Sequence, residues 1–368
     1  MKKTGIANLP LHPGKCPKWL FPRMVLMSRE ISKFIIYEYG ENEFLKRISD
    51  PYFFQSLGNV VGFDWHSSGL TTTLCGALKE GLSPDLGIVA LGGKGRASKN
   101  TPSEIQKACE DFGISTQKSE NLVYASRMSA KVDNALIQDG FQLYHHSFFL
   151  SESGNYAVVQ QGMNPIERYA RRYHWLFGFP CFVEEPHSGI CAEKKEENVL
   201  DLTSKESREC RKTSVDLSKE KPEKILRLCK NLSSDQRSIM EYTGEFQRIS
   251  MPASHLIPQM KERDIETLKK AYELQPENYE ALVSIRGFGA KTVRSLALIS
   301  EIIYGNSASW KDPAKYSFAH GGKDGIPYPV NRELMDENSE LLRDAIKSAK
   351  SGDAEKRNAL YRLSRFYA

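Results

Sequence analysis

The sequence predicts an α+β protein, with a mixed amino-terminal domain of helices and short strands followed by a helical domain. Phe141–Leu150 and Asn155–Gln161 have the composition of two strands, and the turn 151–154 joins them. Apolar residues between Met24 and Ile35 recur with a helical period, as do those beyond residue 222. We therefore divide the chain into an α+β domain (1–191), a charged connector (192–222) and a helical domain (223–368).

Composition restricts the classes of protein to which the chain can belong. Its 368 residues are 40% hydrophobic and 26% charged, as in soluble globular proteins. We find neither an apolar run of about 18 residues nor a signal-peptide core, so we expect a cytoplasmic protein without membrane contact. The seven cysteines are scattered without C-x-x-C pairs, which favours free thiols in a reducing compartment. A net charge of +5 is compatible with nucleic acid as a partner.

The stretch from Leu282 to Ser300 has the form of a helix-hairpin-helix. Gly287 and Gly289 permit a tight turn, because glycine adopts positive φ without steric cost. The amides of Gly289 and Ala290 would then face outward at the start of the second helix, where the helix dipole favours an anion. Further donors adjoin this corner, namely Lys291, Thr292 and Arg294. The pattern predicts a site for DNA phosphate, with sequence-tolerant and salt-sensitive binding. The alternative is an ordinary helical hairpin whose glycines only turn the chain.

A second glycine-rich stretch, residues 86–102, contains Gly-Gly-Lys-Gly-Arg around Lys94, between an apolar strand and a helix start. This order favours a phosphate cradle, although the P-loop pattern is absent. A mobile surface loop is the alternative. Residues 316–332 are rich in glycine and proline and carry Lys323, which we expect to contact DNA if this loop is functional.

The predicted β-hairpin contains His145 and His146, and Asn164-Pro165 predicts that a helix follows it. That helix would carry the basic residues Arg168, Arg171 and Arg172, together with His174. The ββα order resembles the ββα-metal (HNH-type) nucleases, in which a histidine activates water and other residues hold a divalent cation. The resemblance implies catalytic roles for His145, His146 and His174, and we add Asp139 as a fourth candidate catalytic residue. The alternative is that these histidines are interior residues of the strands.

Other carboxylates and imidazoles of the amino-terminal half are candidate metal ligands, namely Asp64, His66, Glu184 and His187. The expected cofactor is a divalent metal, Mg or Mn, with Zn as a further possibility. The sequence does not determine which of these side chains converge.

Several strings resemble an archaeal and bacterial family known as domain of unknown function 763. They are LPLHPGKCPKWLFPRM, GFDWHSSGLTT, KVDNALIQDGFQLYHH, AVVQQGMN, ARRYHW and AHGGKDGIPYPV. The hairpin alone is similar to that of endonuclease-III-type DNA glycosylases, which implies a Schiff-base role for Lys291. Ser309 stands where that family has an aspartate, and this favours a phosphate contact by Lys291 instead.

We therefore expect a DNA-binding protein that grips the backbone of double- or single-stranded DNA and acts as a metal-dependent nuclease in repair or processing. The alternatives are a glycosylase or lyase that uses Lys291, and a non-catalytic nucleic-acid-binding module. Because isolated hairpins bind weakly, we also expect that two chains can pair as a homodimer.

Overall fold

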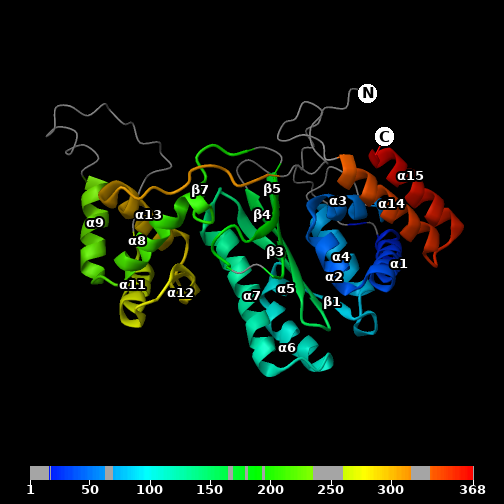
Figure 1. Ribbon diagram of the computed structural model, residues 1–368, viewed down its shortest axis with the longest axis horizontal. Coiled ribbons are helices and arrows are strands. Elements are labelled where there is room, and N and C mark those ends of the chain that lie inside the picture. The colour runs from blue at the N-terminus through cyan, green and yellow to red at the C-terminus, as the bar shows by residue number, and fades with distance from the viewer. Residues whose placement is uncertain are drawn as a thin grey trace.

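The fold is taken from a computed structural model, which describes residues 16, 18–62, 69–164, 169–178, 181–192, 195–234, 260–315 and 332–367. A central sheet lies between two groups of helices (Figure 1). The predicted α+β class is confirmed. None of the described helices is long and apolar enough to span a membrane.

The chain begins with four helices, α1 (Phe21–Tyr39), α2 (Glu41–Ser49), α3 (Pro51–Val60) and α4 (Gly69–Gly81). Helix α1 ends at Gly40, which has a φ of +85°. Glycine adopts this conformation readily. Asp50 caps α3 by accepting a hydrogen bond from the amide of Tyr52 at 2.8 Å, and Pro51 occupies the first helical position. The four helices share one apolar core.

The sheet is antiparallel throughout and has the strand order β1-β3-β4-β5-β6. Its strands are β1 (Ile88–Lys94), β3 (Gln142–Ser151), β4 (Tyr156–Asn164), β5 (Tyr169–Leu176) and β6 (His187–Cys191). The predicted hairpin is confirmed, because β3 and β4 pair with Phe149 opposite Ala157. A separate short pair joins β2 (Ile137–Gln138) to β7 (Leu200–Asp201).

The helix predicted after Asn164 is wrong, because this segment forms the strand β5. Its residues pair with β4 on one side and with β6 on the other. A strand between two neighbours forms backbone hydrogen bonds to both of them. These bonds stabilise β5 more than Asn164-Pro165 favours the start of a helix. The side chains of β5 consequently alternate between the two faces of the sheet.

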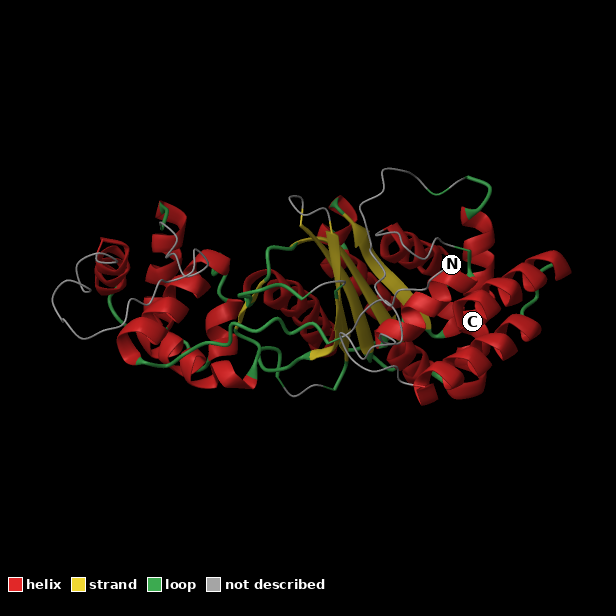
Figure 2. Cartoon of the chain, turned by 90° about the horizontal axis from the view of Figure 1, so that it is seen from above, coloured by secondary structure: helices red, strands yellow, loops and turns green. Residues whose placement is uncertain are grey.

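Helices cover both faces of the sheet (Figure 2). Phe149 and Val159 lie in the core that α1–α4 form on one face, here called the α1–α4 face. Phe148 and Val158 point to the other side, against α6 (Thr101–Asp111) and α7 (Thr116–Ala135), and this is called the α7 face. The one-residue alternation of β3 and β4 thus separates the cores of the two faces.

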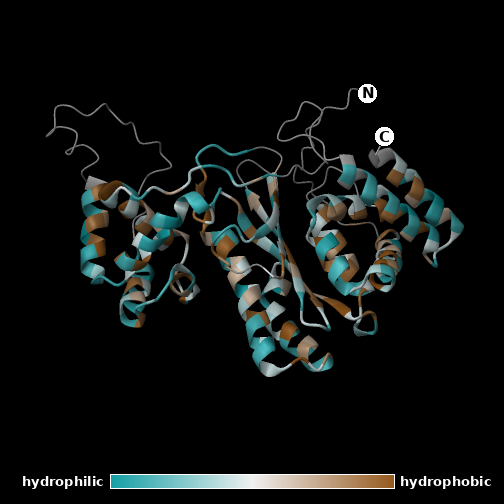
Figure 3. Ribbon diagram, in the orientation of Figure 1, coloured by the Kyte–Doolittle hydropathy of each residue, from teal (hydrophilic) through white to brown (hydrophobic). Residues whose placement is uncertain are grey.

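A helical group beyond α7 contains α8 (Arg208–Ser218), α9 (Pro222–Ser234), α11 (Glu262–Leu274), α12 (Tyr279–Ser284) and α13 (Ala290–Tyr304). Its apolar residues join the core of the α7 face, and brown residues alternate with teal ones along its helices (Figure 3). Segment 192–222, predicted to be a connector, contains α8, whose Cys210 and Val215 are buried in that core.

The last two helices, α14 (Arg332–Ser348) and α15 (Asp353–Tyr367), lie at the opposite end of the molecule from α13 (Figure 1). They pack against α1 and α3, and Leu342, Ile346 and Leu363 belong to the core of the α1–α4 face. The segment predicted as one helical domain, 223–368, is therefore divided between two cores in the structure.

Candidate nucleic-acid interface

The helix-hairpin-helix predicted from the sequence consists of α12, a short turn and α13. The side chain of Asn278 caps α12 by accepting a hydrogen bond from the amide of Ala281 at 2.9 Å. Gly287 has a φ of +98°, and a Cβ at this position would lie 2.8 Å from Oγ1 of Thr267. The turn therefore requires glycine at 287, as predicted. Phe288 is buried beneath it and fixes the turn to the core.

The start of α13 has free backbone donors. No described residue accepts a hydrogen bond from the amides of Gly289, Ala290 or Lys291. Gly289 and Ala290 are half-buried, whereas Gly287 and Lys291 are exposed. Such amides carry the positive end of the helix dipole, and they favour an anion at this corner.

Two of the side chains predicted to contact phosphate at this corner do not reach it. Thr292 is fully buried. Arg294 is half-buried, donates to Oε1 of Gln138 at 2.9 Å and lies over the ring of Trp310. Both point into the protein because α13 presents this side to the rest of the fold. Lys291 and the neighbouring Arg286, which the sequence analysis did not select, are the exposed cations.

The hairpin is held against α7 and β2 by hydrogen bonds to its backbone. Nζ of Lys131 donates to the carbonyl of Ile285 at 2.6 Å, and Nε2 of Gln138 donates to the carbonyl of Ala290 at 2.8 Å. Burial lowers the pKa of Lys131 to about 8. These contacts fix the direction in which the amides at the start of α13 point.

The glycine-rich stretch predicted as a loop is in part strand, because β1 runs through Gly92 and Gly93 to Lys94 and pairs there with β3. The amide of Gly92 donates to Oε2 of Glu104 at 2.8 Å, and Nζ of Lys79 also contacts this carboxylate, at 2.6 Å. A Cβ at Gly92 would lie 2.4 Å from the carbonyl oxygen of His146, so this glycine permits close packing of β1 on β3. Lys94 is exposed, with Nζ 5.7 Å from the centre of the Tyr144 ring.

The two arginines of β5 are buried, so the prediction that they contact phosphate is wrong. Arg171 is paired with Asp139 at 2.9 Å and with Asp312 at 2.6 Å, and none of its side chain is exposed. Arg172 lies on the other face, where it donates to Nε2 of His174 at 2.8 Å. Alternation along a strand, rather than a helical face, determines these positions. Arg168 lies outside the described residues.

The predicted catalytic group does not come together. His146 lies on the α7 face and contacts Ser126 of α7, whereas Nδ1 of His174 lies 3.2 Å from the carbonyl of Ile48 in α2. His145 contacts its strand neighbour Ser147 at 2.9 Å. Asp139 instead accepts from Arg171 and Tyr173 (Tyr173 Oη at 2.7 Å). The four residues are therefore distributed between the two faces of the sheet.

All three histidines have lowered pKa values because burial disfavours their charged form. The pKa of His145 falls to about 3, that of His146 to about 4, and that of His174 well below its ordinary value. At pH 7 these imidazoles are neutral.

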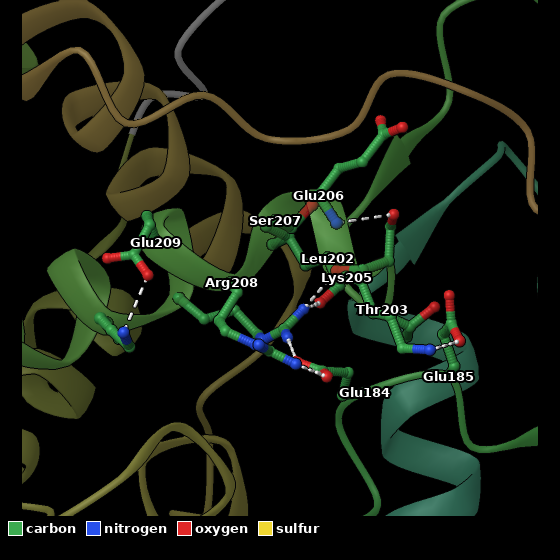
Figure 4. A network of polar contacts seen from close by, with 12 residues as sticks. Glu184, Glu185, Leu202, Thr203, Lys205, Glu206, Ser207, Arg208 and Glu209 are labelled. Carbon is green, nitrogen blue, oxygen red and sulfur yellow. Dashed lines mark hydrogen bonds and ion pairs between the residues drawn. The ribbon is translucent and has the colours of Figure 1, made fainter.

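Of the predicted metal ligands, Glu184 and His187 are occupied by other protein groups. Glu184 accepts from the guanidinium group of Arg208 (Figure 4). It also accepts from that of Arg211, and this cationic surrounding does not fit a metal ion. Nε2 of His187 lies 2.5 Å from Oδ1 of Asp133. Within the described ranges, no three His, Cys, Asp or Glu side chains come close enough to hold a metal. Asp64, His66 and Lys323 lie outside these ranges, and a divalent cofactor stays a prediction.

A chain of buried polar groups, not predicted from the sequence, lies on the α7 face. It consists of Ser126 and Asp133 from α7, His146 from β3 and Gln160 from β4, and is here called the polar chain. The signals for it were a seven-residue spacing on a helix and a glutamine in an otherwise apolar strand. These signals do not reveal that the three elements meet.

The fold defines an α+β protein in which a tight glycine turn joins α12 to α13. The chain belongs to the family described as "Protein of unknown function (DUF763)", whose model matches residues 5–330. Comparisons with curated proteins and with solved structures gave no match.

Proposed function

We propose that this protein binds the phosphate backbone of DNA at the corner formed by Gly287–Lys291. The observation that supports this proposal is the group of free amides at the start of α13, next to the exposed side chains of Arg286 and Lys291. Amides and cations that converge on one exposed point suit a phosphate oxygen. A contact of this kind reads no bases, so binding is sequence-tolerant and salt-sensitive.

The rest of the fold positions this corner. Lys131 and Gln138 bind the hairpin backbone, and the buried ring of Phe288 fixes the turn. A rigid donor group loses little conformational freedom when an anion binds. One corner offers only a few phosphate contacts, and pairing of two chains on one DNA would add a second set. The homodimer is part of this proposal.

The proposal extends to catalysis only through residues other than the described histidines. His145, His146 and His174 are buried and neutral, and His174 lies on the opposite face of the sheet from His146. The nuclease expectation would depend on Asp64 and His66. Lyase chemistry would depend on Lys291, which is exposed at the corner. Trapping with borohydride on abasic DNA tests the lyase.

The test of DNA binding is a fluorescence-anisotropy titration of labelled duplex and single-stranded DNA over a range of salt concentrations. Lys291→Glu should weaken binding several-fold and reduce the salt slope by about 1. Gly289→Glu should also weaken binding, because it places a carboxylate beside the free amides. A Cβ at 289 meets only the carbonyl oxygen of Gly287, at 3.7 Å, so the fold accommodates the change.

The matched control is Lys107→Glu, an exposed lysine of α6 that undergoes the same change of charge. It should bind as the wild type does. If Lys291→Glu and Gly289→Glu bind DNA as tightly as this control at every salt concentration, the hairpin is not the interface. Light scattering of free and DNA-bound protein tests the pairing of chains.

A further inference from the structure

The polar chain ends at a cavity between α7 and the start of β3. This cavity has a volume of about 330 Å³. Ser126, His146 and Gln160 line its buried part, and the exposed residues Lys99 and Arg127 line its outer part. It lies apart from the hairpin, none of whose residues lines it.

Two hydrogen bonds orient the imidazole of His146 within the polar chain. Its Nε2 lies 2.9 Å from Oγ of Ser126, and its Nδ1 lies 2.9 Å from Oε1 of Gln160. The amide nitrogen of Gln160 donates to Oδ2 of Asp133 at 2.5 Å, so its oxygen faces His146. That oxygen can only accept, which places the imidazole proton on Nδ1. Nε2 is then free to accept the hydroxyl proton of Ser126.

Asp133 fixes the far end of the polar chain. Its Oδ2 also accepts from Nε1 of Trp175 at 3.0 Å, and its Oδ1 faces Nε2 of His187 at 2.5 Å. With these partners the carboxylate cannot turn away from Gln160. Four polar groups buried in this way cost more free energy than apolar residues of similar size would. Ser126, His146 and Gln160 follow one another in the order of a nucleophile, a base and a group that orients the base.

We infer that Ser126 is a nucleophile activated by His146, in a site that takes carboxylic esters bearing a negative charge. Oγ of Ser126 forms a bond to the ester carbonyl carbon, and its proton passes to Nε2 of His146. The bond to the leaving alcohol breaks, and His146 returns the proton to that oxygen. Water then attacks the acyl-serine, His146 takes its proton and gives it to Ser126, and the carboxylic acid is released. Lys99 and Arg127 favour an anionic acyl group by their charge.

Two properties of the site suit this chemistry. Burial lowers the pKa of His146 to about 4, so the ring is neutral at pH 7 and its Nε2 lone pair faces Oγ of Ser126. Ser126 lies on a long helix and the residue is only 3% exposed, so its hydroxyl is held in one place and reached by water only through the cavity.

The first experiment treats the full-length protein with an alkyl fluorophosphonate, which transfers its phosphonyl group to an activated serine and releases fluoride. Intact mass spectrometry should show one adduct, and peptide mapping should place it on Ser126. Ser126→Ala and His146→Gln should abolish labelling. Ser129→Ala is the matched control, a buried serine of α7 that does not line the cavity, and it should be labelled like the wild type.

The second experiment compares hydrolysis of 4-nitrophenyl acetate with that of the mono-4-nitrophenyl ester of succinic acid. The charged ester should be the better substrate by kcat/KM, and Arg127→Ala should remove most of this preference. Absence of a fluorophosphonate adduct on the wild type, or an adduct that persists in Ser126→Ala, overturns the inference. The site of the adduct on the wild-type protein decides the question even if a variant does not fold. Equal rates for the two esters would refute the anionic substrate class.

Discussion

Replacement of Arg171 by methionine should destabilise the protein strongly. This arginine is completely buried and bridges two carboxylates, Asp139 and Asp312, whose side chains are 0% and 1% exposed. Removal of the guanidinium leaves both acids buried without a counter-charge. Loss of one partner from a buried ion pair costs about 3–5 kcal/mol, so we expect a loss of this size. The methionine fills most of the space of the arginine stem, which limits the contribution of a cavity.

The measurement is urea unfolding followed by tryptophan fluorescence, with free energies from linear extrapolation. Lys212→Met is the control, because its ion pair with Glu209 is exposed and should contribute almost nothing. Adding Asp139→Asn and Asp312→Asn to the Arg171 variant should restore part of the stability, since the uncompensated charges are then gone. A loss below about 1 kcal/mol for Arg171→Met would refute the buried ion pair.

Two further changes have definite expected outcomes. Gly287→Ala should cost about 1–2 kcal/mol of unfolding free energy because of its positive φ, whereas Gly289→Ala at φ −120° should cost little; equal losses in urea would contradict the described turn. Stability should fall as the pH drops from about 6.5 toward 4, since the unfolded chain protonates His145 and His146 while the folded chain holds their pKa values near 3 and 4. Between pH 7 and pH 4.5, the Tm of His146→Gln should fall by less than the Tm of the wild type.

Local signals predicted the parts of the fold that depend on neighbouring residues. The hairpin of β3 and β4 follows from two strand-like stretches and a four-residue turn, and the α12–α13 turn follows from the glycine at 287. In both places the residues that determine the conformation are adjacent in the chain. Sequence alone could therefore identify them.

Strand β5 and the polar sites could not be predicted in this way. Asn164-Pro165 and the basic residues after it carry a local helix signal, yet partners on both sides draw this stretch into the sheet. The burial of Arg171 likewise depends on Asp312, which is distant in the sequence. Ser126, His146 and Gln160 come from three elements, and only the completed packing of α7 on the sheet brings them into contact.

The return of α14 and α15 to the first helices has a consequence for biosynthesis. Helices α1 and α3 leave the ribosome long before the segments that carry Leu342 and Leu363, which cover them in the finished protein. A domain assembled from early elements alone can complete its core while the chain is being made, whereas this core is complete only once α14 and α15 are present. Until α14 and α15 have been synthesised, the amino-terminal helices keep an apolar side open to solvent. A prematurely terminated chain retains that surface and becomes a client for chaperones or proteases.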